Sequence, residues 1–251
     1  MAKQKGIFPL KGTIGNVTFY KSKDGFLARE KGSLDGKRIA TDPAFQRTRE
    51  NGAEFGRAGA AGKVLRAALR SLHQYAADSR MVARLTKEMM KVIQADAINP
   101  RGARNVIDGE AELLEGFEFN ADSKLSTSLY APFTSAIDRI AGSLSIDIPS
   151  FNPANMVAAP GGTTHFKIVS AGAEIDFENE VYTMHESLTA ELSWDGTATA
   201  LINHVHAVTA NSTHPLFLVL GIQFYQQVNG VFYALKNGAF NALALVKVSG
   251  V

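Results

Sequence analysis

Cysteine is absent from the 251-residue chain, and this excludes several kinds of chemistry at once. Without thiols there is no disulfide framework, no thiolate catalysis and no cysteine-ligated zinc or iron–sulfur centre. Long apolar runs are also missing. The longest, from Pro215 to Ile222, has the length of a strand and falls short of the roughly 18 residues that a membrane-spanning helix needs. The basic N-terminal segment has no apolar run of signal-peptide length. We therefore expect no membrane insertion, and a location in the cytoplasm or within an assembled particle.

Recognisable catalytic motifs are missing too. The sequence has no Gly-x-Ser-x-Gly elbow and no His-Glu-x-x-His helix, which are the motifs of serine hydrolases and zinc peptidases. Segment 56–63 (GRAGAAGK) resembles a phosphate-binding loop only in part. Arg57 stands where that loop needs its first glycine, and Val64 replaces the magnesium-binding hydroxyl. We therefore predict a protein that is not an enzyme and that uses no cofactor.

Two histidines, His204 and His206, alternate along an expected strand, so their imidazoles share one side. That spacing can bind a metal ion if a third ligand joins them. The third ligand would be His165, His185 or His214, and nothing in the sequence brings one of these close. A pair of ordinary surface or half-buried histidines is the commoner outcome. We predict no metal site, with His204 and His206 as weak candidates for one.

Three acidic residues, Asp176, Glu178 and Glu180, alternate along one face in the same way. Calcium needs several carboxylate oxygens, but the Asp-x-Asp-x-Asp-Gly loop that usually supplies them is absent. We expect these side chains to lie on a solvated strand or loop edge.

What the chain does have is charge of opposite sign in its two halves. Residues 1–105 hold 21 Lys and Arg against 9 Asp and Glu, a net charge of +12. Residues 106–251 hold 5 against 15, a net charge of −10, so the net charge of +2 for the whole chain conceals the division. Such a division indicates two parts with different partners, or one part that meets the opposite part of a neighbouring copy. Contact between the two halves of a single chain is the simplest alternative.

The basic half shows a hairpin pattern followed by a helical pattern. Strand-favouring residues on either side of a Lys-Asp-Gly turn predict a β-hairpin over residues 12–31. Asp42 and Pro43 then suit the start of a helix. Apolar and small residues recur beyond them at spacings of three and four, which indicates one buried helical face. These are Phe55, Ala58, Gly62, Leu65, Leu69 and Leu72. A second helix is expected to open at Asp78.

Glycine is frequent in the first of these helices. A glycine in a helix costs about 1 kcal/mol relative to alanine, so a cluster of them needs an explanation. We expect that the helix breaks in this region or that another backbone approaches it closely. The glycines are Gly52, Gly56, Gly59 and Gly62.

The acidic half carries a pattern of strands. Two Asn-Gly pairs, at 229–230 and 237–238, separate apolar runs and predict an antiparallel meander of the last three strands. Strand number and turn spacing together predict a β-sandwich. The expected strands cover 124–130, 142–148, 165–170, 174–177, 188–194, 199–208, 216–227, 231–236 and 239–248.

The expected strand 216–227 is apolar on both faces. Leu216, Leu218, Leu220 and Ile222 would lie on one face, and Phe217, Val219 and Tyr225 on the other. A strand with one face in water would alternate polar and apolar residues. This strand therefore lies between the sheet core and the N-terminal helices, or another subunit covers it.

These patterns predict an α+β protein in two domains. Residues 1–105 form a basic module of a β-hairpin and helices, and residues 106–251 form an acidic antiparallel β-sandwich. The candidate assembly or partner-binding residues are the cations of the basic module and three apolar residues of the strand just described. They are Lys21, Lys23, Arg29, Lys31, Arg47, Arg49, Arg80, Arg84, Lys87, Lys91, Leu218, Leu220 and Ile222.

Three short segments resemble a family of small uncharacterised proteins found across Bacteroidota. They are Lys11–Tyr20 (KGTIGNVTFY) with Asp24-Gly25 and Arg29, then Phe45–Arg49 with Phe55–Ala58, and the junction Gly116–Asn120. The resemblance covers roughly the first half of the chain and carries no activity. It implies a basic N-terminal hairpin with helices and a C-terminal β domain, in a bacterial or phage-borne protein.

The charge division and the doubly apolar strand lead to one functional hypothesis and two alternatives. The hypothesis is a non-enzymatic structural protein, such as a phage virion component or a surface filament subunit. It would self-associate or join a larger assembly through complementary charged modules and apolar strand surface. The first alternative is a nucleic-acid-binding module in the basic half. The second is a carbohydrate- or peptide-binding β-sandwich with a cleft around Trp194, Tyr182 or Tyr225.

Overall fold

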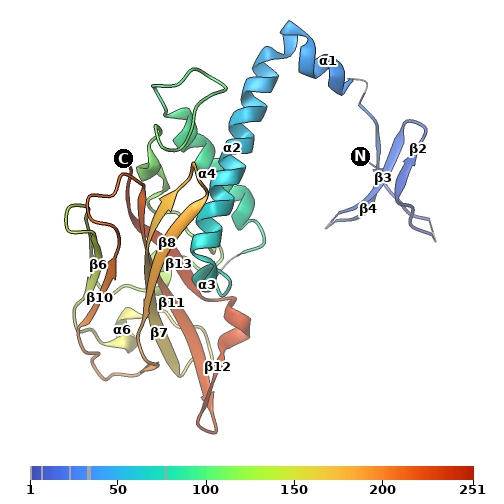
Figure 1. The fold of residues 1–251 in the computed structure, drawn as a ribbon. Coiled ribbons are helices and arrows are strands. Elements are labelled where there is room, and N and C mark those ends of the chain that lie inside the picture. The colour runs from blue at the N-terminus through green and yellow to red at the C-terminus, as the bar shows by residue number, and fades with distance from the viewer. Residues whose placement is uncertain (1, 7, 23, 33–34, 77) are drawn as a thin grey trace. The chain divides into compact units, whose positions relative to one another are not determined.

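The computed structural model describes residues 2–6, 8–22, 24–32, 35–76 and 78–251 (Figure 1). The chain divides into two compact units, which we call unit 1 (residues 1–49) and unit 2 (residues 50–251). Helices and antiparallel sheets occur together, so the mixed α+β class is confirmed. Among the residues described, no helix is both long and apolar enough to cross a membrane.

Unit 1 contains a small antiparallel sheet followed by short helical turns. The strands are β1 (Ala2–Lys3), β2 (Gly12–Ile14), β3 (Val17–Ser22) and β4 (Gly25–Glu30), in the order β1-β4-β3-β2. Helix α1 (Gly36–Thr41) begins where the Asp35 side chain accepts a hydrogen bond from the amide of Lys37. Asp42 caps the next turn, η1 (Pro43–Phe45), by accepting from the amide of Ala44. The Asp-Pro helix start expected from the sequence is therefore present.

Three helices of unit 2 form one layer over a large sheet. They are α2 (Gln46–Ala68), whose first turn contains the division between the units, α3 (Arg70–His73) and α4 (Met81–Gln94). Helix α2 runs unbroken through all four glycines. A methyl group placed at Gly52, Gly56 or Gly59 would meet nothing within 4 Å, and one at Gly62 would meet only side chains, the nearest of them Leu85 at 3.6 Å. Both explanations expected for these glycines, a helix break and a close backbone, are therefore wrong.

The large sheet has two long central strands, and two shorter strands pair with the outer edge of each. β11 (Leu216–Val228) pairs with β7 (His165–Asp176) along ten residue pairs, from Leu216 with Glu174 to Tyr225 with His165. On the outer side of β7 lie β8 (Val181–Leu188) and β9 (Leu192–Ser193). On the outer side of β11 lie β12 (Val231–Ala234) and β13 (Ala242–Ser249).

The last three strands differ from the expected meander. Asn229 and Gly230 do form the tight turn between β11 and β12, with φ angles of 51° and 80°. Asn237 and Gly238, however, end η3 (Leu235–Gly238), and β13 then returns to pair with β11. An Asn-Gly pair fixes a local reversal of the chain but not the strand that pairs next. The expected strand over 124–130 is also wrong, because a turn of helix, α5 (Leu125–Ser128), occupies its centre.

A second, smaller sheet faces the other side of the large one. It contains β5 (Thr134–Asp138), β6 (Ser143–Ile148) and β10 (Ile202–Ala207), in the order β10-β6-β5. The remaining short elements of unit 2 are η2 (Ala111–Leu114) and α6 (Pro153–Met156).

Strand β11 is covered on both faces within its own chain. Phe217 and Val219 pack with α2 and α4 in one hydrophobic cluster. Leu218, Leu220 and their neighbours pack with the small sheet in a second cluster. Of the two explanations for a doubly apolar strand, the structure therefore shows the first, a position between the sheet core and the N-terminal helices.

The expected domain boundary near residue 105 falls inside unit 2. Residues 50–105 hold 10 Lys and Arg against 5 Asp and Glu, a net charge of +5. They pack against strands of the acidic half, and unit 2 as a whole has 15 against 20, a net charge of −5. Part of the charge division is therefore neutralised within one chain. The cationic excess that remains belongs to unit 1, with 11 Lys and Arg against 4 Asp and Glu, a net charge of +7.

Candidate functional site

The sheet of unit 1 carries an apolar face. Residues directly opposed on neighbouring antiparallel strands point to the same side. Ile14 is opposite Val17, Phe19 is opposite Ala28, and Lys21 is opposite Phe26. Because alternate residues of β3 also share a side, these side chains lie together on one face, with Lys21 and Glu30 at its ends. We call Ile14, Val17, Phe19, Phe26 and Ala28 the apolar face of unit 1.

Among the described residues of unit 1, no hydrophobic core supports this face. Both hydrophobic clusters of the structure consist of unit 2 residues. Among the described apolar residues of unit 1, Leu27 alone is buried, and it points to the opposite side with Tyr20. Ile14 is 66% exposed and Val17 36% exposed. A small sheet with one buried apolar side chain has too little buried area to be stable on its own, so the apolar face needs a covering surface.

Lys21 lies at one end of the apolar face and Arg29 lies on the opposite face with Tyr20, and both cations lie over aromatic rings. Lys21 Nζ is 5.5 Å from the centre of the Phe26 ring, and the Arg29 guanidinium is 5.5 Å from that of Tyr20. Lys21, Arg29 and Lys31 are all exposed, as the sequence predicts for partner-binding residues. The predicted residue Lys23 lies outside the described part of the chain.

The two other predicted cations of unit 1 differ in their surroundings. Arg47 is exposed. Arg49 is half-buried, and its Nη1 donates to the carbonyl oxygens of Ile39 at 2.7 Å and Asp42 at 2.9 Å. Arg49 therefore connects α1 and the residue after it to the first turn of α2 through its Nη1 atom.

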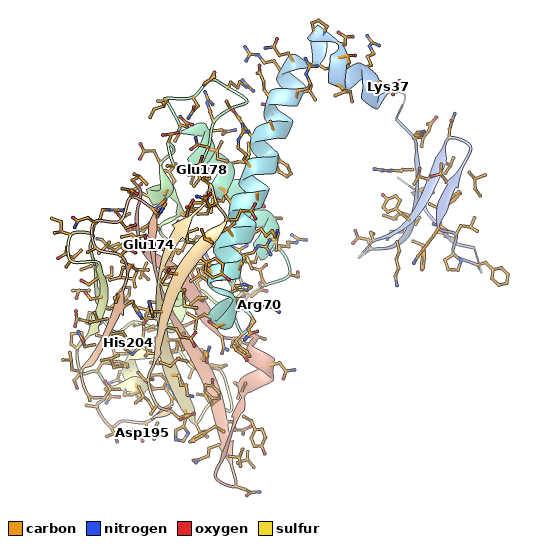
Figure 2. All side chains as sticks on the ribbon, in the orientation of Figure 1. Lys37, Arg70, Glu174, Glu178, Asp195 and His204 are labelled. Carbon is orange, nitrogen blue, oxygen red and sulfur yellow. The ribbon has the colours of Figure 1, made fainter. Side chains whose placement is uncertain are left out.

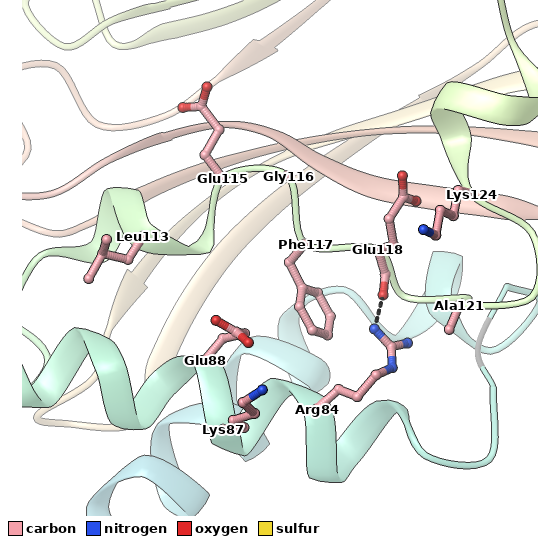
Figure 3. A pocket seen from close by; sticks show the side chains of 10 residues that line it. All are labelled: Arg84, Lys87, Glu88, Leu113, Glu115, Gly116, Phe117, Glu118, Ala121 and Lys124. Carbon is pink, nitrogen blue, oxygen red and sulfur yellow. Dashed lines mark hydrogen bonds between the residues drawn. The ribbon is translucent and has the colours of Figure 1, made fainter.

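Two of the four cations predicted as a basic stripe, Arg84 and Lys87 of α4, line a hollow of about 410 Å³ together with the segment 113–124 (Figure 3). Arg84 makes three contacts within the fold. Its Nη1 donates to the carbonyl oxygen of Glu118 at 2.7 Å, and its Nη2 pairs with Asp78. Its guanidinium lies 5.1 Å from the centre of the Phe117 ring. Lys91 pairs with Glu88 at 2.5 Å. Arg80 and Lys87 remain exposed.

Charge in this hollow is balanced. Three cations and three carboxylates line it, so it has no net attraction for an ion of either sign. Burial raises the pKa of the Glu118 carboxyl, against the hydrogen bonds that it accepts from the amide of Leu125. The lining residues are Arg84, Lys87, Glu88, Leu113, Glu115, Gly116, Phe117, Glu118, Ala121 and Lys124.

The three predicted apolar partner residues are not surface residues. Leu218, Leu220 and Ile222 are completely buried between the two sheets. The prediction that these three residues form an assembly surface is therefore wrong, because the small sheet covers that face of β11.

His204 and His206 form a buried polar cluster with a serine. Ser170 Oγ lies 2.6 Å from His204 Nδ1 and 2.9 Å from His206 Nε2. The single hydroxyl proton can be donated to one ring, so the other ring must donate to the oxygen. Burial lowers the pKa of both imidazoles, that of His206 to about 4. Among the described residues, no group of three or more His, Asp or Glu is placed to hold a metal ion.

The aromatic residues of the predicted carbohydrate or peptide cleft lie at the two ends of β7: Tyr225 and Trp194 lie at the His165 end, and Tyr182 lies at the other. Tyr182 is paired with Ile175 and Tyr225 with His165, ten residues apart on β7 and therefore about 33 Å apart along that strand. The indole of Trp194 donates to the carbonyl oxygen of Val157 at 3.2 Å. The sequence-based candidates do not include the apolar face of unit 1. The alternation of Val17, Phe19 and Lys21 along one expected strand is the pattern that indicates it.

Comparisons with known proteins give no relative: no family model, no curated protein and no solved structure matches this chain.

Proposed function

We propose that this protein is a non-enzymatic structural subunit that associates with other copies of itself, as in a phage particle or a surface filament, and that unit 1 is its contact element. The observation that carries the proposal is the apolar face of unit 1, which has no hydrophobic core beneath it among the described residues and belongs to a unit with a net charge of +7. In this proposal unit 2 is a β-sandwich scaffold, because its two antiparallel sheets bury one shared core.

A second copy is the occupant that the charges favour. Unit 2 has a net charge of −5, so the basic unit of one molecule and the acidic unit of another attract each other. Such a contact joins two different surfaces, and repeats of it build rings or filaments. Screening by salt weakens the electrostatic part, because the Debye length falls to about 8 Å at physiological ionic strength.

The test is the molar mass in solution of two variants with neighbouring substitutions, measured by size exclusion with light scattering at low and at high salt. Ile14→Glu places a charge on the apolar face. Thr13→Glu places the same charge on the other face of the same strand and is the matched control, since both residues are exposed. We expect wild-type protein to associate, Thr13→Glu to change the dissociation constant less than threefold, and Ile14→Glu to raise it about tenfold or more, since burying one Ile side chain contributes about 1.5–3 kcal/mol.

Two results contradict the proposal. One is a wild-type protein that stays monomeric at high concentration in both salts. The other is association that Ile14→Glu leaves unchanged.

Nucleic-acid binding by unit 1 is the second candidate function. It is favoured by the excess of cations and by the lysine and arginine side chains that lie over aromatic rings, since phosphate contacts and base stacking supply most non-specific affinity. A gel shift with single-stranded and double-stranded DNA and RNA tests it. Absence of binding at about 50 mM salt, where phosphate-driven affinity is high, eliminates this candidate.

A further inference from the structure

Unit 2 has a second hollow, of about 470 Å³, whose charge is not balanced. Helix α2, the segment 105–108 and the turn between β7 and β8 line it, and Figure 2 shows Glu178 of that turn beside α2. We call it the acidic hollow. Its lining residues are Arg57, Ala60, Ala61, Asn105, Val106, Ile107, Asp108, Phe177, Glu178 and Glu180.

A hydrogen-bond network holds one wall of the acidic hollow in place. Burial opposes ionisation of Asp96, but the hydrogen bonds that its carboxylate accepts from Ile98, Asn99 and Asn105 lower its pKa to about 2. Asp108 Oδ2 in turn accepts from the side-chain amides of Asn99 at 2.8 Å and Asn105 at 2.7 Å. These hydrogen bonds join Asp108 and Asn105, which line the hollow, to the Asp96–Asn99 segment.

The opposite wall is fixed by an aromatic contact. The Phe177 ring lies edge-on to the buried Phe217 ring, with centres 5.9 Å apart. Val106 and Ala61, which line the hollow with it, are nearly buried, so its floor is apolar.

The rim carries two carboxylates, those of Glu178 and Glu180, that the described part of the fold does not use. Arg57 is the one cation among the lining residues, and its guanidinium donates to the carbonyl oxygens of Gly102 and Arg104. Neither the Glu178 nor the Glu180 carboxylate has a hydrogen-bond or ion-pair partner within the described part of the chain, and both residues are exposed. With Asp108 they give the lining a net charge of −2, whereas the hollow beside α4 has none.

A hollow with an apolar floor and a carboxylate rim suits a partner surface that presents an aromatic ring with a cationic group beside it. Among the described residues, three exposed cations lie over a phenylalanine ring: Lys21 over Phe26, Arg38 over Phe45 and Lys236 over Phe240. The first pair is the one that belongs to the apolar face of unit 1, at the end of β3 and β4, with Lys21 exposed and Phe26 half-buried. There Lys21 is opposite Phe26 and its ammonium lies over that ring. The ring can cover the apolar floor while the ammonium meets Glu178 and Glu180.

We propose that the acidic hollow is the acceptor for Lys21 and Phe26 of a second copy, so that molecules join head to tail. This inference rests on the proposed function and names the surface that the contact element meets. The donor surface and the acceptor surface are different. Each molecule in a chain therefore uses one of each, and a free donor and a free acceptor remain at the two ends.

Two variants separate donor from acceptor in the full-length protein. Lys21→Glu removes the donor charge and keeps the acceptor. The double variant Glu178→Lys/Glu180→Lys removes the acceptor and keeps the donor. Each alone should raise the dissociation constant at least tenfold at low salt, as measured by light scattering. The matched control, Glu115→Lys/Asp122→Lys, makes the same change of charge at exposed acidic positions away from the acidic hollow and should change it less than threefold.

The decisive experiment mixes the two variants in equal amounts. One competent contact remains between a Lys21→Glu molecule, which offers its acceptor, and a double-variant molecule, which offers its donor. The mixture should therefore form 1:1 dimers and stop there, while each variant alone stays monomeric. A mixture that stays monomeric overturns the inference, as does a double variant that assembles like wild type. Both results leave the proposed function standing if the wild-type protein associates. A wild-type protein that is monomeric at high concentration overturns both.

Discussion

The sheet of unit 1 and the large sheet of unit 2 are both antiparallel, yet they are stabilised in opposite ways. In unit 2, helices cover one face of the sheet and a second sheet covers the other, so that even Phe217 and Leu218, neighbours in sequence, are both completely buried. In unit 1, Leu27 is the single buried apolar residue among those described, and Ile14 and Val17 stay exposed. The pairing of strands alone therefore does not indicate whether a sheet is stable within its own chain. The burial of both faces of the sheet does.

The largest effect expected from this comparison is on stability. Leu220→Ala, between the two sheets of unit 2, should lower the free energy of unfolding by about 2–5 kcal/mol, because it leaves a cavity in a fully enclosed core. Ile14→Ala, on the apolar face of unit 1, should change it by less than about 0.5 kcal/mol in dilute monomer. Urea unfolding of both variants measures the difference. Equal losses would break the comparison.

Acid should act on the two-sheet core of unit 2 through its buried histidines. Burial lowers the pKa of His206 to about 4, below the ordinary value of 6.5. Between these two pH values the unfolded chain therefore binds more protons than the folded chain does. The stabilisation is fully present above pH 6.5, and the free energy of unfolding falls as the pH is lowered toward 4. A shift of this size corresponds to about 3 kcal/mol at most.

The measurement is the urea midpoint at pH 7 and at pH 4.5, where most carboxylates are still ionised. His206→Asn should lower stability at pH 7 and reduce the difference between the two midpoints. An unchanged difference in the variant would show that His206 does not cause the acid sensitivity.

The smallest expected effect is a gain in stability on α2. Because a methyl group at Gly56 would meet nothing within 4 Å, Gly56→Ala should stabilise unit 2 by up to about 1 kcal/mol. Gly172→Ala is the contrasting substitution, since its methyl group would lie 2.6 Å from His206 Cβ, where the two sheets approach. Thermal unfolding should show a higher midpoint for the first variant and a lower one for the second.

The sequence predicted the parts of the fold that depend on local pattern. The Asp-Pro helix start at residues 42–43, the tight turn at Asn229-Gly230 and the doubly apolar strand that became β11 all follow from neighbours along the chain. The pairing of β13 with β11 in place of β12, and the small sheet that buries Leu218, depend on contacts between distant segments, which no local pattern specifies.

The candidate site shows the same limit. The cations Lys21, Arg29 and Lys31 could be predicted as surface residues because charge is costly to bury. Arg49 and Arg84 could not be separated from them, since only the folded chain shows which carbonyl oxygens they reach. Glu178 and Glu180 could be predicted as a solvated edge, whereas Asp176 is half-buried and accepts hydrogen bonds from the amides of Glu178 and Asn179. The apolar floor beside the two glutamates comes from α2 and residues 105–108.

The central claim is that another copy covers the apolar face of unit 1, and amide hydrogen exchange tests it most directly. Exchange is measured for residues 17–30 and for β11 at a dilute and at a high protein concentration. We expect protection of residues 17–30 to rise with concentration while that of β11 stays the same, because β11 is enclosed within one molecule. Equal protection of residues 17–30 at both concentrations would contradict the claim.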